Sequence, residues 1–547
     1  MSRRLLGNLL PKSFCPCLPF YYIWFCFAVS AKIYNMLVRT FASAVAGIDA
    51  VTVTIEVNVS QGVRFFLVGL PDVAVKESQQ RIESAIRTLG YHWPGRQVVV
   101  NMAPADIRKE GSAYDLPLAA GILAADGKIS GKDLESFVIM GELSLDGTLQ
   151  PVRGVLPIAL RAREEGFKGV ILPSKNAREA AVVNGLEVFG LEKLADVIDL
   201  FNGTRKFDPV RIDLNEIFNG EANRYDVDFS DVKGQENVKR ALEVAAAGHH
   251  NLLMIGPPGS GKTMLAKRLA TIMPPLTLEE ALETTKIHSV AGKIDDHTAL
   301  MTRRPFRSPH HTISDVALVG GGTFPQPGEI SLAHNGVLFL DELPEFKRSV
   351  LEVMRQPLED RIITISRAKS TCDYPASFML IASMNPCPCG FHNHPDKECV
   401  CSPGMVQKYL NRISGPLLDR IDIHIEVVPV KYEKLADQAK PDRSENVRER
   451  IIRARNIQAK RFAQFKGVYS NSQMTASMQR RYCQLDEAGG KLLRTAMEIR
   501  GLSARAYDRI LKVARTIADL DESDNIMAEH ISEAINYRNL DREGWAG

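Results

Sequence analysis

A phosphate-binding pattern lies near the middle of the chain, where residues 256–263 read GPPGSGKT and match G-x-x-x-x-G-K-[ST]. An apolar run at 252–255 precedes the pattern and a helical pattern follows it at 264–273, which is the strand–loop–helix setting that such a loop needs. In this setting backbone N–H groups hold a phosphate, the Lys262 ammonium reaches the β- and γ-phosphate oxygens, and the Thr263 hydroxyl binds Mg²⁺. The sequence therefore predicts a nucleotide site made by Gly256, Pro257, Pro258, Gly259, Ser260, Gly261, Lys262 and Thr263.

Two adjacent carboxylates follow a second apolar run. Residues 336–340 read GVLFL, and Asp341 and Glu342 come directly after them. A buried strand that ends here predicts Asp341 in the Mg²⁺ shell and Glu342 beside the attacking water, which Glu342 would orient and polarise. Acidic pairs are common at strand ends, but the phosphate-binding pattern upstream favours the functional interpretation.

Three further polar side chains are candidates for phosphate contacts. Asn385 follows the apolar strand 379–382 and could hydrogen-bond the γ-phosphate or the water; alternatively it only forms a turn before Pro386. Arg420 could stabilise transition-state charge at a neighbouring subunit's γ-phosphate, or form an Arg–Asp pair within its own chain. Arg505 opens a helical pattern at 506–520 and could add a phosphate contact from a C-terminal lid.

Four cysteines cluster just after Asn385. Two C-x-C pairs, Cys387 with Cys389 and Cys399 with Cys401, could surround a tetrahedral Zn²⁺, although each pair is tighter than the usual C-x₂-C spacing. His392 and His394 lie between the pairs and could replace a thiolate, and a reduced loop without metal is the alternative. We expect a structural zinc that holds this loop.

The composition sets the class of protein. The chain has 547 residues, of which 45% are hydrophobic and 24% charged, which excludes disorder, collagen repeats and a disulfide scaffold, and the length suggests three to four domains. The net charge of +3 gives no global field for nucleic acid, so any such contact must come from local basic clusters.

Residues 1–35 carry an apolar run at 18–29 behind basic residues, which resembles a signal peptide. The run is shorter than the roughly 20 residues of a membrane span, and Pro11, Pro16 and Pro19 argue against a good helix there. We expect translation to begin at Met36 and residues 1–35 to be upstream, non-native sequence, with a real signal or anchor as the alternative. A cytoplasmic protein without a membrane segment is expected.

The rest of the chain divides by its patterns. Strands alternate with helices over 36–204, which predicts an α/β or α+β domain, and a polar linker follows at 205–225. The nucleotide-binding core is expected at 226–430, with the Cys-rich insertion at 387–401, and a mainly helical lid at 431–547.

The first domain resembles the proteolytic domain of Lon proteases at 114–121 (YDLPLAAG), 140–147 (MGELSLDG) and 170–173 (VILP). That family uses a serine activated by a lysine. Here the serine position falls at or beside Tyr114 and the lysine position at Ile158, which cannot accept a proton. Ser112 is nearby, but no lysine is obviously placed to activate it. The resemblance implies a Lon-like fold that serves assembly or partner binding without peptidase activity.

The chain from about Met36 to Asp541 resembles AAA+ ATPases of the magnesium-chelatase-like branch, and more closely the ComM/YifB family. The motifs are FRSPHHT (306–312), PGEISLAH (327–334), RQPLED (355–360) and NPCPCG (385–390). The resemblance implies an α/β fold: an AAA+ P-loop domain with a helical lid, preceded by a Lon-protease-like α+β domain. It also implies a homo-hexameric ring, dependent on nucleotide or DNA, that uses ATP and Mg²⁺, with Arg420 as the trans-acting finger and Arg505 as second sensor.

The same resemblance implies a partner. Members of the ComM type act as branch-migration helicases on single-stranded or branched DNA during natural transformation. A hairpin expected at 360–374 carries Arg367 and Lys369 near its tip, and such hairpins face the ring pore, so these two are candidate DNA contacts; a solvated turn is the alternative. A chelatase- or chaperone-like remodeller of a protein partner is the second functional hypothesis.

His310 and His311 lie in a segment that follows Pro309. They could sense substrate, cap a helix or simply pack. No metal-partner pattern around them supports a catalytic role.

Overall fold

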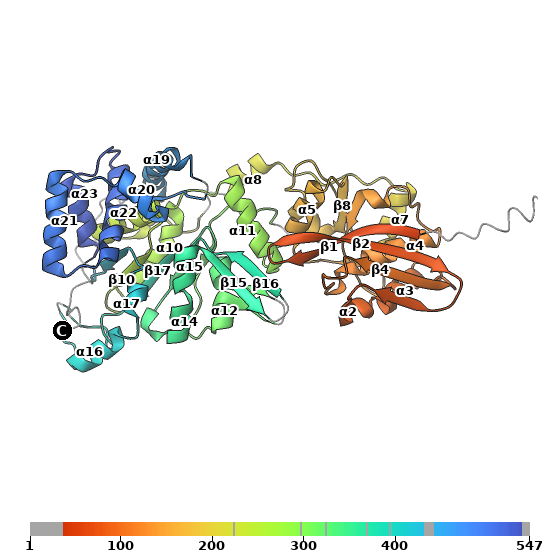
Figure 1. The fold of residues 1–547 in the computed structure, drawn as a ribbon, viewed down its shortest axis with the longest axis horizontal. Helices are drawn as coiled ribbons and strands as arrows, with labels where there is room; N and C mark the ends of the chain where they lie inside the picture. Colours follow the sequence, from red (N-terminus) through yellow and green to blue (C-terminus); the bar gives the residue numbers. More distant parts are fainter. Residues whose placement is uncertain are drawn as a thin grey trace, which may run out of the picture.

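The structure is a computed structural model in which two bodies lie end to end (Figure 1). It describes residues 37–221, 225–295, 298–322, 325–367, 370–392, 394, 396–430, 442–465 and 467–538. The interpretation of residues 1–35 as upstream sequence therefore lies outside the described residues. Among the described residues, no helix combines the length and apolar content that a membrane crossing needs.

The N-terminal body is built on a seven-stranded mixed sheet in the order β3-β4-β2-β1-β5-β8-β9. Its strands are β1 (Leu37–Ala46), β2 (Asp49–Ser60), β3 (Phe65–Val68), β4 (Gln97–Ala103), β5 (Phe137–Ile139), β8 (Gly169–Pro173) and β9 (Glu187–Leu191). β2 pairs antiparallel with both β1 and β4, and the other neighbours are parallel. Alternate residues of β2, among them Val53, Ile55 and Val57, are fully buried, because successive side chains of a strand point to opposite faces of the sheet.

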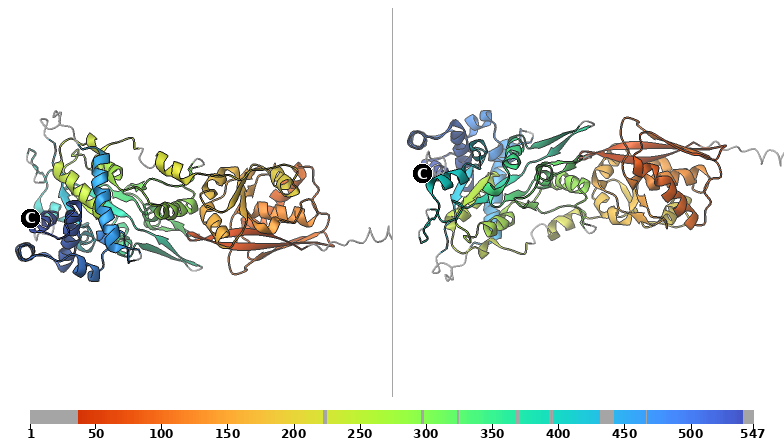
Figure 2. Two further views of the ribbon diagram at one scale, coloured as in Figure 1. Left: turned by 90° about the horizontal axis from the view of Figure 1, so that it is seen from above. Right: turned by 90° about the horizontal axis from the view of Figure 1, so that it is seen from below.

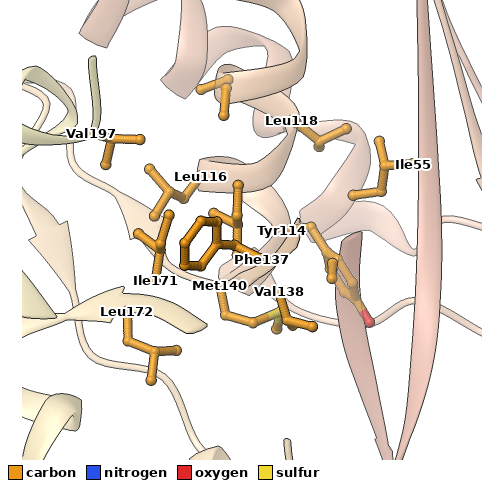
Figure 3. Packing of buried hydrophobic residues seen from close by; sticks show 14 of the residues in the cluster. Ile55, Tyr114, Leu116, Leu118, Phe137, Val138, Met140, Ile171, Leu172 and Val197 are labelled. Carbon is orange, nitrogen blue, oxygen red and sulfur yellow. The ribbon is translucent and has the colours of Figure 1, made fainter. Parts of the chain in front are cut away.

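Helices pack against this sheet and complete its core. They include α3 (Ser78–Thr88), α4 (Asp115–Ala125), α5 (Val155–Glu164), α6 (Ser174–Ala180) and α7 (Leu194–Asn202). Every residue of α4 is buried, and Leu116 and Leu118 of this helix lie among Ile55, Phe137 and Ile171 of the sheet (Figure 3). The strands and helices confirm the α+β class expected for this body.

The C-terminal body contains a five-stranded parallel sheet in the order β11-β14-β17-β10-β18. Its strands are β10 (Leu252–Ile255), β11 (Phe306–Arg307), β14 (Val337–Leu340), β17 (Met379–Met384) and β18 (Ile423–Glu426). The three central strands are buried along their whole length, which explains why they read as unbroken apolar runs. Because parallel strands end at the same edge, the segments after β10, β14 and β17 lie side by side.

Helices surround this sheet and continue into a helical C-terminal part. Those of the core include α9 (Glu236–Gly248), α10 (Lys262–Ile272) and α11 (Leu278–Val290); those of the C-terminal part are α19 (Ser444–Phe462), α20 (Ala476–Tyr482), α21 (Glu487–Arg500), α22 (Ala504–Leu520) and α23 (Ala528–Asn536). One face of α22 is apolar and buried, and it includes Ile510, Ala514 and Ile517. These residues share one hydrophobic cluster with α9 and β10, so the helical lid packs directly on the sheet domain.

A hairpin of the C-terminal body contacts the N-terminal body. β15 (Ile362–Arg367) and β16 (Ser370–Pro375) pair antiparallel, which confirms the expected hairpin, and it points toward the N-terminal body (Figures 1 and 2). The β1–β2 turn contacts it: a Cβ atom built on Gly47 would lie 3.7 Å from the Cβ of Cys372. An ion pair of 3.2 Å between Asp49 and Lys286 of α11 adds a second contact between the bodies.

Candidate nucleotide site

The predicted phosphate-binding loop joins the end of β10 to the start of α10. Gly259 and Gly261 have φ angles of +79° and +92°, which glycine adopts without the steric cost of a Cβ. A Cβ on Gly256 would lie 2.2 Å from the carbonyl oxygen of Val427, so the close approach of the residue that follows β18 also requires glycine there. The first N–H groups of α10, which begins at Lys262, therefore face the loop and can bind an anion.

Lys262 lies at the centre of this loop. Its ammonium donates to the carbonyl oxygens of Gly256 (2.8 Å) and Pro257 (3.0 Å) and to Oδ1 of Asn385 (3.2 Å). Burial lowers the pKa of Lys262, and the carboxylates of Asp341 and Glu342 partly oppose that effect. The structure thus brings together two side chains that the sequence assigned to the same phosphate.

A second group of oxygen atoms surrounds Asp341. The hydroxyl of Thr263 donates to Oδ2 of Asp341 at 2.7 Å, and the hydroxyl of Ser383 donates to Oδ1. Hydroxyl and carboxylate oxygens are the donors that Mg²⁺ prefers, so these residues fit that ion. Sequence reasoning assigned no role to Ser383; its signal was its place two residues before Asn385 on a buried strand.

The loop also contains a buried polar atom that suits a phosphate. Oγ of Ser260 is buried and has no hydrogen-bond partner within the described part of the chain. A buried hydroxyl without a partner is costly unless a ligand satisfies it. Ser260 together with Lys262 therefore fits a bound phosphate.

Glu342 is the second residue after the strand β14 and has an unusual backbone. Its φ of +55° is in the left-handed region, which is uncommon for a residue with a side chain and clusters at functional sites. Its N–H donates to Oδ1 of Asp341 at 3.1 Å, and its Oε2 lies 3.5 Å from Nδ1 of His311. The backbone of Glu342 is thus tied to the Asp341 carboxylate, while its side chain contacts His311.

The two candidate arginines form pairs within the chain. The guanidinium of Arg420 is buried, donates to the carbonyl of Pro416 (2.6 Å) and lies 2.7 Å from Glu359. This is an intramolecular pair of the kind weighed as the alternative, but with Glu359 in place of an aspartate. Arg505 is more exposed and pairs with Asp419 at 3.2 Å. The structure therefore brings Lys262 into contact with Asn385 and Thr263 into contact with Asp341. Arg420 and Arg505 instead pair with Glu359 and Asp419.

The four cysteines of the insertion converge. The sulfur atoms of Cys387, Cys389, Cys399 and Cys401 all lie within 4.8 Å of one another. The sulfur of Cys387 lies 3.3 Å from that of Cys389 and 3.7 Å from that of Cys399, and the sulfurs of Cys389 and Cys399 are 3.6 Å apart. Zn–S bonds of about 2.3 Å in a tetrahedron give sulfur separations of roughly 3.8 Å. Nδ1 of His394 accepts the N–H of Asp396 at 3.0 Å, which leaves only its Nε2 for a metal. The donor set fits Zn²⁺ through four thiolates.

The candidate DNA contacts are not placed by the structure. Arg367 is the last residue of β15, but its side chain lies outside the described residues, as does Lys369. The hairpin that carries them is present, and their contact with DNA stays a prediction.

Together the parallel sheet, the phosphate-binding loop and the acidic and amide side chains at neighbouring strand ends define a P-loop ATPase core with a helical lid. Magnesium-chelatase family models match three segments: the ChlI subunit at residues 228–435, a further ChlI segment at 55–176, and the ChlI C-terminal part at 441–538. The chain is 43% identical over 509 residues to the competence protein ComM of Haemophilus influenzae, covering 92% of this chain and 98% of that protein. It is 42% identical over 503 residues to YifB of Salmonella typhimurium, covering 91% and 96%.

The chain therefore belongs to the ComM/YifB family of magnesium-chelatase-like AAA+ proteins. Membership implies an ATPase that uses ATP and Mg²⁺. Over 145 residues the chain is also 30% identical to Lon protease 2 of Bacillus subtilis, which covers 26% of each protein and confirms the partial Lon resemblance.

Proposed function

We propose that this protein is an ATP-hydrolysing ring motor that acts on DNA, as a branch-migration helicase of the natural transformation type. The observation that carries the proposal is the match to a protein named for competence along 98% of its length. A nucleotide site in which Lys262 contacts Asn385 and Thr263 contacts Asp341 supports the ATP chemistry. We infer a homo-hexamer, assembled with nucleotide or DNA, because phosphate-directed arginines in such ATPases act between subunits.

The residues of the site have separate tasks in this proposal. Lys262 exchanges its contacts with Gly256 and Pro257 for phosphate oxygens, and Thr263 with Asp341 holds Mg²⁺. Mg²⁺, when bound, neutralises phosphate charge. Glu342 accepts a proton from the attacking water and orients it, while Asn385 hydrogen-bonds the γ-phosphate or that water.

The two arginines contact the nucleotide from outside the phosphate-binding loop. In the assembled ring Arg420 leaves Glu359 and stabilises the transition-state charge at the neighbouring subunit's γ-phosphate. Arg505 leaves Asp419, contacts the nucleotide of its own subunit and closes the lid. The Arg505–Asp419 pair is largely exposed on the arginine side, so its exchange for phosphate costs little, whereas the buried guanidinium of Arg420 must find the phosphate in place of Glu359.

Zinc and DNA sites complete the proposal. Cys387, Cys389, Cys399 and Cys401 hold a structural Zn²⁺ that stiffens the segment after Asn385. Arg367 and Lys369 at the hairpin tip contact the DNA phosphate backbone.

The N-terminal body acts in assembly or partner binding and has no peptidase activity in this proposal. The position of the family's lysine is occupied by Ile158, which is buried in α5. Tyr114, at or beside the serine position, is buried as well. Neither side chain can supply a serine–lysine dyad.

A second candidate function is remodelling of a protein partner, as in a chelatase or chaperone. The match of the magnesium-chelatase ChlI model to residues 228–435 favours it, as does 25% identity over 177 residues to the magnesium-chelatase 38 kDa subunit of Rhodobacter capsulatus. The two candidates share the ATP site and differ in what stimulates it.

The deciding experiment measures the ATPase rate of the protein with a four-way DNA junction, with a linear duplex of the same strands, and without DNA. A junction-dependent increase, absent in Lys262→Ala, supports the DNA motor. Hydrolysis that responds to no DNA rejects the DNA motor in favour of a protein substrate.

A further inference from the structure

A histidine from another part of the chain reaches the carboxylate of Glu342. Nδ1 of His311 lies 3.5 Å from Oε2 of Glu342, and the two side chains are 32% and 56% exposed. His311 belongs to the segment that leaves β11, the edge strand, whereas Glu342 follows β14. The contact therefore depends on the pairing of β11 with β14, which sets Phe306 opposite Val337.

The imidazole of His311 is held on two further sides. The ring of His310 lies against it with centroids 4.1 Å apart and planes inclined by 34°. The ring of Phe346 meets it edge-on, with centroids 6.4 Å apart and an interplanar angle of 79°. Two aromatic neighbours limit the rotamers of His311, so the ring stays directed at the carboxylate.

His310 is itself fixed in place. Its Nδ1 lies 2.9 Å from Oγ1 of Thr312, and its carbonyl accepts the N–H of Ile313 at 3.0 Å. Ile313 packs against the hydrophobic cluster that contains Leu340 and Phe346. The His310–His311 pair is thereby anchored to the same core as the strand that presents Glu342.

The Glu342 side chain needs a partner such as His311, because few of its other neighbours restrict the position of its carboxylate. More than half of its side chain is exposed, and a glutamate has three rotatable side-chain bonds, so the carboxylate alone would sample many positions. A general base acts efficiently only when it is held within hydrogen-bond reach of the water. A contact on Oε2 limits the rotation of the carboxylate and leaves Oε1 for the attacking water.

We propose that His311 is a positioning residue for ATP hydrolysis, which orients Glu342 through its Nδ1–H. The inference rests on the proposed role of Glu342 as the base. His310 and Phe346 support it by holding the imidazole. The functional pair is thus a histidine and a glutamate that sequence patterns alone do not connect.

The test compares steady-state hydrolysis by the full-length protein and its His311→Ala and His311→Asn variants. We expect His311→Ala to lower kcat about ten- to hundred-fold with an unchanged KM for ATP and unchanged assembly. Asparagine offers a side-chain N–H near the position of Nδ1, so His311→Asn should recover much of kcat. His92→Ala, at an exposed position of the N-terminal body, is the matched control and should behave like the parent.

A double variant separates this role from a structural one. Single-turnover hydrolysis by His311→Ala combined with Glu342→Gln should equal that by Glu342→Gln alone, because the base that His311 orients is already missing. A parent-like or raised kcat in His311→Ala overturns the inference, as does an additive loss in the double variant. If Glu342→Gln itself hydrolyses ATP at the parent rate, the proposed role of Glu342 fails, which is a different outcome.

Discussion

Gly390 lies directly against Pro258, so the Cys-rich insertion touches the phosphate-binding loop. A Cβ atom built on Gly390 would come within 2.5 Å of Cδ of Pro258. Gly390 has a φ of +86°, and its N–H donates to the carbonyl of Cys387 at 3.0 Å. The turn that contains the thiols of Cys387 and Cys389 therefore packs against the phosphate-binding loop.

This contact predicts that Gly390→Ala impairs nucleotide binding. The new methyl group would strain the backbone by about 1–3 kcal/mol and push Pro258. We expect a several-fold higher KM for ATP, measured by titration of the ATPase rate. Gly404→Ala, at a position where a Cβ meets nothing within 4 Å, should leave KM unchanged. Equal KM values in both variants would show that the contact does not shape the loop.

Zinc binding by the four thiols predicts one Zn²⁺ per chain. Elemental analysis of the purified protein should find this ratio, and Cys399→Ser should lower it strongly, since a thiolate ligand is lost. Cys372→Ser, which changes a cysteine outside the cluster, is the control and should retain the metal. Parent protein that neither contains nor takes up zinc would contradict the assignment.

Glu342→Gln should bind ATP and fail to hydrolyse it. Glutamine keeps the size of the side chain but cannot accept the proton of the water, so the rate should fall roughly 10²–10⁴-fold. Filter binding measures the retained ATP, and phosphate release measures the rate. Loss of ATP binding, instead of loss of turnover, would assign Glu342 to nucleotide binding and not to the chemical step.

A trans-acting Arg420 predicts complementation between two inactive variants. Arg420→Ala lacks the arginine supplied to a neighbour and Lys262→Ala cannot bind nucleotide, so each variant alone should be inactive. In mixed rings, some sites combine an intact loop with a neighbour's intact Arg420, and activity should return in part. The rate is followed across mixing ratios, with each variant alone at the same total concentration as control. Absence of recovery at every ratio argues that Arg420 serves its own subunit through Glu359.

The surroundings of the Asp422 carboxylate predict that the free energy of unfolding falls at acidic pH. It is almost fully buried, lies 3.0 Å from Arg509 of α22 and 3.3 Å from His250, and accepts the N–H of Asn251 at 3.0 Å. Burial alone would raise the pKa of Asp422, but Arg509 and His250 lower it more, so this pKa is held well below its ordinary range. The stabilisation is present above the unfolded pKa of about 4 and is lost as the pH falls below it.

Asp422→Asn should therefore lower the free energy of unfolding by about 3–5 kcal/mol at neutral pH, since Arg509 keeps its charge without a counter-charge. The variant should also show less loss of stability between pH 5 and pH 3. Denaturant titrations at several pH values measure both effects, with exposed Asp208→Asn as control. A variant as stable as the parent at pH 7 would mean that the pair contributes no net stability.

The nucleotide loop could be predicted because its signals are local. Residues 252–263 contain strand, loop and helix start in one stretch, and glycine is required by backbone angles that depend on immediate neighbours. The positions of Asp341 and Asn385 were predictable for a related reason, since each follows a short apolar run and parallel strands end at a common edge. The Lys262–Asn385 distance of 3.2 Å agrees with that expectation.

Partner choice among distant side chains could not be predicted in the same way. Arg420 pairs with Glu359, and the expected alternative was an aspartate. Ser383 donates to Asp341, and its place two residues before Asn385 does not by itself identify this partner. The sequence alone does not choose among the interpretations of His311, because its contact with Glu342 depends on the pairing of β11 with β14. Each pair depends on which strands are neighbours and on rotamers that packing selects.

The amino-acid order by itself determined the family motifs, the alternation of strands and helices and the chemistry available at each strand end. These follow from short-range sterics, hydrophobic period and capping, which act between residues a few positions apart. Only the tertiary structure decided that His311 faces Glu342 and that Gly390 presses on Pro258. Such contacts join segments far apart in the chain, and they arise from the packing of whole sheets and helices around a shared core.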